Sequence, residues 1–529
     1  MSATTPLAPA TSDGAIGPAS PVGAHRAPSS AARAIVTTYG ARAATLVAYL
    51  ALLPVVLHSV GPDAYGLYAL TVALGAIFQQ DLGIGDATTR FIAHAHPVGD
   101  RDRMRQIAAA SAGFYLVAAL VMGAAVAASL TLTIGAAAVP ATLHATAWLL
   151  VVLGSANVFL LLALSPARQV LAGIGRIDDV NTALIVQAVV RVVLTLTVCA
   201  LGWGILAVAL ADLTATLVLG GLTLWLRRRR APALTVHLAD FRWATFRELF
   251  AMSAQLMVIG LSAVVVTQIG GVLTAVLLPL AFTALFTAGQ RMYLVVKEVT
   301  SSLSTALLPM AAMQERTVGA DAHRTLYLAG TRYANMLMTI VLVPAVLFMP
   351  VIMTSWIGSD GAPAALVAQI LILSLFANNN HLLAMPILIA QGRVRPYAVL
   401  HAVWAVTGTA LAALLGSALG LPGIALGLAL PIVVLEPVYV AVVLRRVGAG
   451  ARTFLVQCLL GPLLPAVPLA AALCAVAVLM RPSLAQAALL SAAWTLALGG
   501  AYLMTDAPAR RALGRLMGRD APARRESAG

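Results

Sequence analysis

Long, unbroken apolar segments recur along this sequence, and they restrict its fold more than any other feature. The first covers residues 35–57 and the last residues 484–504, and charged residues, glycine or proline bound each one. A helix needs about 20 apolar residues to cross the hydrocarbon core of a bilayer. With 61% hydrophobic and 10% charged residues, the chain has too little polar surface to cover a soluble globule. The sequence therefore predicts an all-α polytopic membrane protein.

The number of apolar segments sets the expected number of transmembrane helices at about fourteen. Three prolines in the thirteenth segment should kink that helix, because proline lacks the backbone N–H of a helical hydrogen bond. The expected helices cover residues 35–57, 65–90, 107–132, 146–170, 180–201, 204–226, 248–270, 280–310, 325–350, 364–390, 397–417, 423–443, 454–480 and 484–504.

Arginines follow every second helix and so predict the orientation of the chain. Cytoplasmic loops of membrane proteins hold an excess of basic residues, and the other connections here hold only Arg481. Both termini are therefore expected on the cytoplasmic side of the membrane, and the membrane is expected to be a bacterial inner membrane. The net charge of +14 reflects this topology, and no nucleic-acid partner is expected. The arginines concerned are Arg26, Arg33, Arg90, Arg101, Arg103, Arg105, Arg168, Arg176, Arg227 to Arg230, Arg242, Arg247, Arg316, Arg324, Arg393, Arg395, Arg445, Arg446, Arg452 and those between Arg510 and Arg525.

A weak internal repeat divides the chain. Pro62 corresponds to Pro279 and Gly175 to Gly392 at one constant offset, and six expected helices separate the copies. An even number gives both copies the same orientation, as in transporters with parallel repeats, and places the substrate path between the lobes. The expected organisation is a disordered cytoplasmic tail (1–34), an N-terminal six-helix lobe (35–226), a cytoplasmic loop (227–247), a C-terminal six-helix lobe (248–443), two additional transmembrane helices (454–504) and a basic cytoplasmic tail (505–529).

Ionisable residues inside expected spans are costly in lipid, so they should face a cavity or a partner. They form two polar stripes at helical spacing, one on the first helix and one on the eighth. The stripes predict opposing walls of one hydrated cavity, although Arg291 and Glu298 could instead bridge neighbouring helices and Arg42 could reach the cytoplasmic surface. The stripes consist of Thr38, Arg42, Thr45 and Tyr49, and of Thr287, Arg291, Glu298, Ser302 and Thr305, with Lys297 about a third of a turn away.

Further polar residues occur in other spans. Arg191 and Asp212 lie on consecutive helices and are expected to form a structural ion pair rather than a substrate site. The tenth helix carries asparagines at positions 378–380, followed by His381. These side chains could face the cavity and bind sugar hydroxyls, or they could hydrogen-bond between helices. All three cysteines lie in apolar segments, so neither a disulfide framework nor a metal cluster is expected.

The segment from Gly61 to His94 carries a resemblance to a known family. It reads GPDAYGLYALTVALGAIFQQDLGIGDATTRFIAH and resembles the second transmembrane helix of bacterial polysaccharide transporters. These are oligosaccharide flippases of the multidrug/oligosaccharidyl-lipid/polysaccharide exporter superfamily. The resemblance implies that cationic residues of the first and eighth helices meet the diphosphate of a lipid-linked sugar, and Arg42 and Arg291 occupy matching positions. Where some flippases of lipid-linked precursors carry an arginine in the second helix, this chain has Asp81.

The expected function is therefore flipping of undecaprenyl-diphosphate-linked oligosaccharide by alternating access. No catalytic residue or cofactor is expected, and no Gly-rich phosphate loop for ATP occurs. The expected partners are lipid-linked oligosaccharide and membrane lipid, with a polysaccharide polymerase and a chain-length regulator as further candidates. The candidate substrate-binding residues are Arg42, Arg291, Lys297, Asp81, Glu298 and Asn379.

Three alternatives remain open from the sequence. A cation-coupled multidrug exporter of the same superfamily would use acids such as Asp81 or Glu298 to bind the coupling ion, although the basic cavity argues against it. A lipid II flippase would use the same diphosphate chemistry. A membrane polysaccharide polymerase or glycosyltransferase would need a catalytic outer loop, yet the expected outer loops are short and their acids are Asp63 and Asp360.

Overall fold

The computed structural model describes residues 28–80, 83–137, 139–232, 234, 238–318, 320–382, 384, 388 and 395–505. Within these ranges all regular elements are helices, and 12 of them are long and apolar enough to cross a membrane. Two further helices complete the bundle: α2 (Pro62–Phe78), which is shorter but apolar, and α10 (Leu280–Val318), which carries three charged residues between positions 280 and 299. The predicted all-α polytopic fold, with about fourteen membrane-crossing segments, is confirmed.

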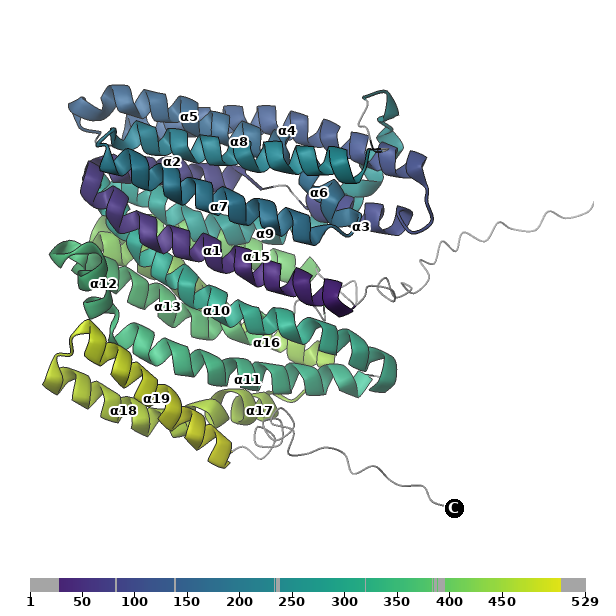
Figure 1. The fold of residues 1–529 in the computed structure, drawn as a ribbon. Helices are drawn as coiled ribbons and strands as arrows, with labels where there is room; N and C mark the ends of the chain where they lie inside the picture. The colour runs from purple at the N-terminus through teal and green to yellow at the C-terminus, as the bar shows by residue number, and fades with distance from the viewer. Residues whose placement is uncertain are drawn as a thin grey trace, which may run out of the picture.

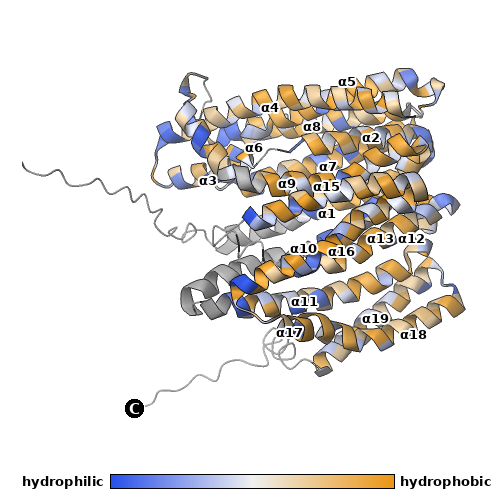
Figure 2. Cartoon of the chain, turned by 180° about the vertical axis from the view of Figure 1, so that it is seen from behind, coloured by the Kyte–Doolittle hydropathy of each residue, from blue (hydrophilic) through white to orange (hydrophobic). Residues whose placement is uncertain are grey.

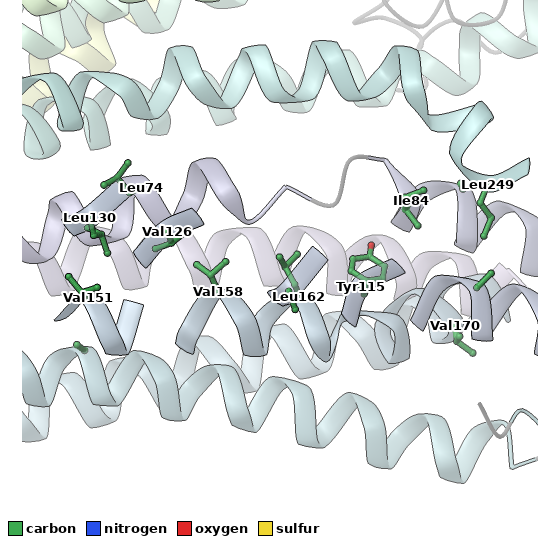
Figure 3. Packing of buried hydrophobic residues seen from close by; sticks show 14 of the residues in the cluster. Leu74, Ile84, Tyr115, Val126, Leu130, Val151, Val158, Leu162, Val170 and Leu249 are labelled. Carbon is green, nitrogen blue, oxygen red and sulfur yellow. The ribbon is translucent and has the colours of Figure 1, made fainter. Parts of the chain in front are cut away.

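The first eight helices pack mainly on one another (Figure 1). Close pairs include α1 with α7, α7 with α8, and α4 with α5. Six of the eight helices, α2 to α6 and α8, share an apolar core that includes Tyr115, Val126, Leu130 and Val158 (Figure 3). Besides α2, the helices of this group are α1 (Pro28–Val60), α3 (Ile84–Ala95), α4 (Arg101–Ala136), α5 (His144–Ala163), α6 (Ser165–Gly173), α7 (Ile177–Ala200) and α8 (Gly204–Arg230).

A second group of helices packs beside the first (Figure 1). Its closest pairs are α15 with α16, α9 with α15, and α13 with both α10 and α16. The two groups meet where α2 contacts α9 and α10, and a Cβ at Gly66 would lie 2.1 Å from the backbone oxygen of Leu280, so only glycine permits this approach. Besides α10, the second group contains α9 (Trp243–Leu277), α11 (Ala320–Leu347), α12 (Met349–Ile357), α13 (Ala362–Leu382), α15 (Arg395–Leu419) and α16 (Leu421–Val447).

The last helices form a separate pair against α11 (Figure 1). They are α18 (Gly461–Met480) and α19 (Leu484–Thr505), preceded by α17 (Ala451–Phe454) and a π-helical turn at Leu455–Leu460. The indole of Trp494 on α19 donates a hydrogen bond to the backbone oxygen of Ile340 on α11, over 2.9 Å. This bond and the surrounding apolar contacts attach the pair to the second group.

Several predicted helix bounds are wrong, for identifiable reasons. The helix expected over residues 65–90 is two helices, because α2 ends at Phe78 and α3 begins after Gly83, whose φ of 76° is left-handed. The helix expected over residues 146–170 also divides, because Pro166 cannot continue α5 and instead starts α6. Residues 28–34, expected in the disordered tail, are the first turns of α1, and α8 extends through residues 227–230 of the expected loop.

The hydropathy of the residues changes along the length of the helices. Apolar residues cover the middle of the bundle, and hydrophilic residues concentrate toward the ends of the helices (Figure 2). The arginine-rich start of α4 and the arginine-rich end of α8 lie at the same end of the bundle, whereas α12 lies at the opposite end (Figure 1). This segregation is the structural counterpart of the alternating arginines.

We expect the arginine-rich end of the bundle to face the cytoplasm. In a cysteine-free background, cysteines at Asp360 or Arg481 should react with an impermeant thiol reagent added outside the cytoplasmic membrane. Cysteines at Arg101 or Arg229, which are also exposed, should react only after the membrane is opened. External labelling at position 229 would contradict the orientation.

Candidate functional site

Two adjoining polar cavities lie where the two helix groups meet. The larger has a volume of about 310 Å³ and is lined by α1, α2, α5, α6, α7, α8, α9 and α10. Single polar side chains within otherwise apolar helices give it its hydrogen-bonding capacity. The residues shared by both cavities include Tyr49, Tyr68, Arg191, Asp212, Gln268 and Arg291.

Tyr49 of α1 brings two arginines together at the cavity wall. The guanidinium carbon of Arg291, from α10, lies 4.3 Å from the centre of the Tyr49 ring, and that of Arg191, from α7, lies 5.4 Å away. Arg191 also donates a hydrogen bond to the Tyr49 hydroxyl over 3.0 Å. The electron-rich ring stabilises cations above it. The two positive charges therefore come from different helix groups and approach each other through one aromatic side chain.

Arg191 is partly neutralised and Arg291 is not. The Nε of Arg191 lies 2.5 Å from Oδ1 of Asp212, on α8, and the Tyr68 hydroxyl donates to the other carboxylate oxygen. The predicted Arg191–Asp212 pair is thus confirmed, but both members also line the cavity. Within the described residues Arg291 forms no ion pair, and its contact is the Tyr49 ring. The cavity therefore presents an excess positive charge.

Arg42 and Glu298 pair with each other rather than with the cavity arginines. Their side chains lie 3.0 Å apart, and each is about two-fifths exposed. The pair joins α1 to α10, and neither residue is among those that line the two cavities. The predicted stripe on α1 is divided, since Thr45 and Tyr49 face the cavity whereas Thr38 accepts a hydrogen bond from Asn181.

The other candidates lie elsewhere. The Lys297 ammonium is 5.9 Å from the Tyr293 ring centre and away from the lining of both cavities. Asn379 is buried in the second helix group, where it donates to Asn335 over 2.9 Å. For this residue the structure matches the alternative expectation, hydrogen bonding between helices. Asp81 lies outside the described residues.

Sequence reasoning missed the amides of the cavity wall, which come from three helices and from the end of α2. One signal could have indicated part of the set: Gln187 lies one helical turn before Arg191, and Asp212 one turn before Thr216, so each pair shares a face. A glutamine that has no other polar residue one helical turn away gives no comparable signal in the sequence. In the part of the chain with described side chains, no group of three His, Cys, Asp or Glu residues is placed to hold a metal ion. The missed amides are Gln79, Asn157, Gln187 and Gln268.

Arg42→Glu should weaken function modestly by placing two carboxylates where an ion pair joins α1 to α10. Exposed pairs contribute about 0.2–1 kcal/mol, so we expect a transport rate lower by roughly two- to fivefold and unchanged protein abundance. The double variant Arg42→Glu/Glu298→Arg should recover the wild-type rate. Failure of the double variant to recover would mean that Arg42 acts through a partner other than Glu298.

Comparisons with known proteins agree with this architecture. Lipid II flippase MurJ, in an inward closed conformation, has a TM-score of 0.70 at 12% identity and covers 89% of this chain and 98% of its own. A multidrug resistance MATE family transporter of the MOP superfamily, in an inward-facing conformation, has a TM-score of 0.65 at 17% identity and covers 76% of this chain and 94% of its own. At these identities the likeness establishes a shared fold, and both matched structures are transporters or flippases. No curated protein matches the chain in sequence.

Family membership follows from the sequence match. The profile of the family described as polysaccharide biosynthesis protein matches residues 31–315, more than half of the chain. The match spans the first helix group, α9 and most of α10, and so includes the helices that line the cavities. The chain belongs to the polysaccharide biosynthesis protein family, and its fold is similar to those of the MATE family transporter and of lipid II flippase MurJ.

Proposed function

We propose that this protein is a flippase that moves undecaprenyl-diphosphate-linked oligosaccharide across the inner membrane by alternating access. Its product would serve synthesis of a surface polysaccharide such as O-antigen, capsule or exopolysaccharide. The observation that carries the proposal is the pair of arginines, Arg191 and Arg291, held at Tyr49 in a polar cavity between the two helix groups. The role is transport, without a catalytic step.

The charge of the cavity suits a diphosphate. A guanidinium stays ionised and donates paired hydrogen bonds that match phosphate oxygens. Arg291 forms no ion pair among the described residues, so its charge is free to bind an anion. Arg191 could add a second contact, because its charge is shared with Asp212 across the same cavity. Two arginines on different helix groups would then contact one headgroup.

The amides of the cavity wall suit the sugar. Asn157, Gln187 and Gln268 each offer a carbonyl acceptor and N–H donors, which can pair with hydroxyls in several orientations. A wall of this kind tolerates different glycans more readily than a row of fixed charges. The lipid tail would remain in the bilayer, where its burial is favourable.

We propose that the two helix groups act as an N-terminal lobe (35–226) and a C-terminal lobe (248–443). Alternating access would come from rocking of one lobe against the other. Contacts between them include the exposed ion pairs Arg42–Glu298 and Arg103–Glu248. Exposed pairs contribute little stability, so they can separate during each cycle.

Reconstitution tests the proposal directly. Purified protein in liposomes should move fluorescent undecaprenyl-diphosphate-linked N-acetylglucosamine between leaflets without ATP, as measured by an impermeant quencher. The matched control is the corresponding undecaprenyl-monophosphate sugar, which should move more slowly because it offers fewer oxygens to the arginines. Transport of a cationic dye with no movement of the diphosphate lipid would favour a multidrug exporter instead. Equal movement of lipid II would identify a lipid II flippase.

Depletion in cells separates a flippase from an enzyme. Synthesis of the lipid-linked oligosaccharide should continue, but the product should stay on the cytoplasmic leaflet while surface glycan falls. Downstream partners, a polysaccharide polymerase and a chain-length regulator, would then lack substrate. Loss of the polymerase would have a different result, because single repeat units would still reach the outer side of the membrane. Single repeat units outside depleted cells that have no second flippase would rule the proposal out.

A further inference from the structure

A second polar cluster is buried within the second helix group, apart from the cavity residues. The Nδ1 of His381, on α13, lies 2.5 Å from Oε2 of Glu436, on α16. Their side chains are 2% and 8% exposed. Neither residue lines the cavities described above. A charged group at such a position within a membrane helix is costly and calls for a functional explanation.

Aromatic residues enclose the pair. The Tyr439 ring stacks on His381 with 4.3 Å between ring centres, and its hydroxyl lies 2.9 Å from Nδ1 of His401. The Tyr397 hydroxyl donates to the backbone oxygen of His381 over 3.0 Å. These contacts hold the imidazole in place against the carboxyl group. The enclosure keeps bulk water from the pair in this conformation.

The remaining groups around the pair supply no close countercharge. The titratable side chains that face it are Tyr327 from α11, Tyr397 and His401 from α15, and Tyr439 from α16 itself. Farther from the pair, Lys297 of α10 acts electrostatically on His401, Cys458 from the π-helical turn acts on Tyr327, and Arg332 of α11 acts on Cys458. The part of α9 from Met257 to Leu277 carries no titratable side chain. Among the described residues, the ion-pair partner of Glu436 is His381.

The net charge of the His381–Glu436 pair depends on how many protons it holds in the enclosed packing of this structure, which we call the closed site. The short contact between Nδ1 and Oε2 needs one proton between them, and with that proton alone the pair carries one net negative charge. A second proton, on either residue, makes the pair neutral overall. Oε1 of Glu436 is buried and has no hydrogen-bond partner among the described residues. An unsolvated carboxylate oxygen is expensive without a donor, so this closed packing favours the pair that holds both protons.

The helix beside the pair is built to bend. Pro437 follows Glu436 directly and has no N–H, so the carbonyl oxygen of Val433 lacks its helical partner, and α16 also contains Pro431. α16 packs on α13, and α13 packs on α10, which carries Arg291. A change of packing at Glu436 can therefore reach the wall of the substrate cavity through two helix contacts.

We propose that the His381–Glu436 pair is a proton-binding site that couples substrate movement to the transmembrane proton gradient. In the closed site the pair holds one proton more than in an open site, in which α16 is bent and water reaches the pair. When α16 bends and water enters, that proton leaves to water, and the negative pair stays hydrated until a proton from the other side returns. The coupling of the proton to substrate movement rests on the proposed transport function. Proton binding by the pair does not, and it can be tested without any substrate.

The substrate-free test is thermal unfolding of the purified protein over a series of pH values. The wild-type midpoint should fall as the pH rises above about 6.5, the pKa of an unfolded histidine, because the folded pair then holds one proton more than the unfolded chain and must lose it to stay folded at higher pH. Glu436→Gln should remove this fall, whereas Asp102→Asn, at a carboxyl that is 86% exposed, should retain it. If Glu436→Gln is not recovered from the membrane, His381→Phe keeps a ring beside Tyr439 and should start the fall at lower pH, near the pKa of a free glutamate (about 4.3), because no histidine proton remains to balance it in the unfolded chain. A wild-type pH dependence in the recovered variant would overturn the proposal.

The transport test uses liposomes with an imposed pH gradient and clamped membrane potential. In the wild type and in Asp102→Asn, the gradient should drive unequal distribution of the fluorescent undecaprenyl-diphosphate sugar. In Glu436→Gln, the lipid should only equilibrate, at a rate that the gradient does not change. Gradient-driven accumulation in Glu436→Gln would refute coupling through this pair. If the wild type moves no diphosphate lipid, the proposed function fails, while the unfolding series still decides the proton site.

Discussion

Arg291→Ala should lower the rate of diphosphate-lipid movement by roughly a hundredfold, because removing one partner of a shielded, hydrogen-bonded charge pair costs about 3 kcal/mol. The effect should be large because Arg291 lies against Tyr49 in the cavity lining and has no carboxylate partner among the described residues. The measurement is the initial rate of quencher protection in liposomes that contain equal amounts of each protein.

Two further variants are controls for Arg291→Ala. Arg291→Lys should recover activity only in part, since an ammonium keeps the charge but cannot donate the paired hydrogen bonds of the guanidinium. Lys297→Ala changes a neighbouring cation on the same helix that lies away from the cavity lining, and it should have little effect. Wild-type rates in Arg291→Ala at normal abundance would refute the assignment of the headgroup site.

Asp212→Ala should destabilise the protein by about 3–5 kcal/mol, because the change leaves the Arg191 guanidinium largely buried without its carboxylate partner. The Asp212 side chain is 9% exposed and that of Arg191 is 21% exposed, so solvent screens the lost pair weakly. The Tyr68 hydroxyl would lose its acceptor as well. The thermal unfolding midpoint of the purified protein should therefore fall.

A double variant separates structure from substrate binding at this pair. Replacing both members by apolar residues, as in Arg191→Met/Asp212→Leu, should restore most of the stability, since apolar replacements of a buried ion pair are often neutral or stabilising. If Arg191 also binds the diphosphate, the restored protein should transport slowly. Wild-type transport by the stable double variant would leave the pair with a structural role alone, as the sequence suggested.

Much of the fold could be predicted because it depends on features that are local in sequence. Apolar segments long enough to span a bilayer must form helices in lipid, where every backbone polar group needs an internal partner. The alternating arginines indicate orientation in the same local way. The breaks at Gly83 and Pro166 were harder to predict, since glycine and proline also occur inside continuous membrane helices such as α16.

The sequence by itself determined the fold class and the family resemblance, and it suggested the pairing of Arg191 with Asp212, because these residues lie on consecutive helices joined by a short turn. Only the tertiary structure decided which charges meet across long separations. It joined Arg42 to Glu298 and placed Arg291 against Tyr49, beside the Arg191–Asp212 pair. It also brought His381 to Glu436, and in each case the partners lie on helices far apart in the chain. The spacing along one helix defines a face, but the neighbour of that face is set by how all the helices pack.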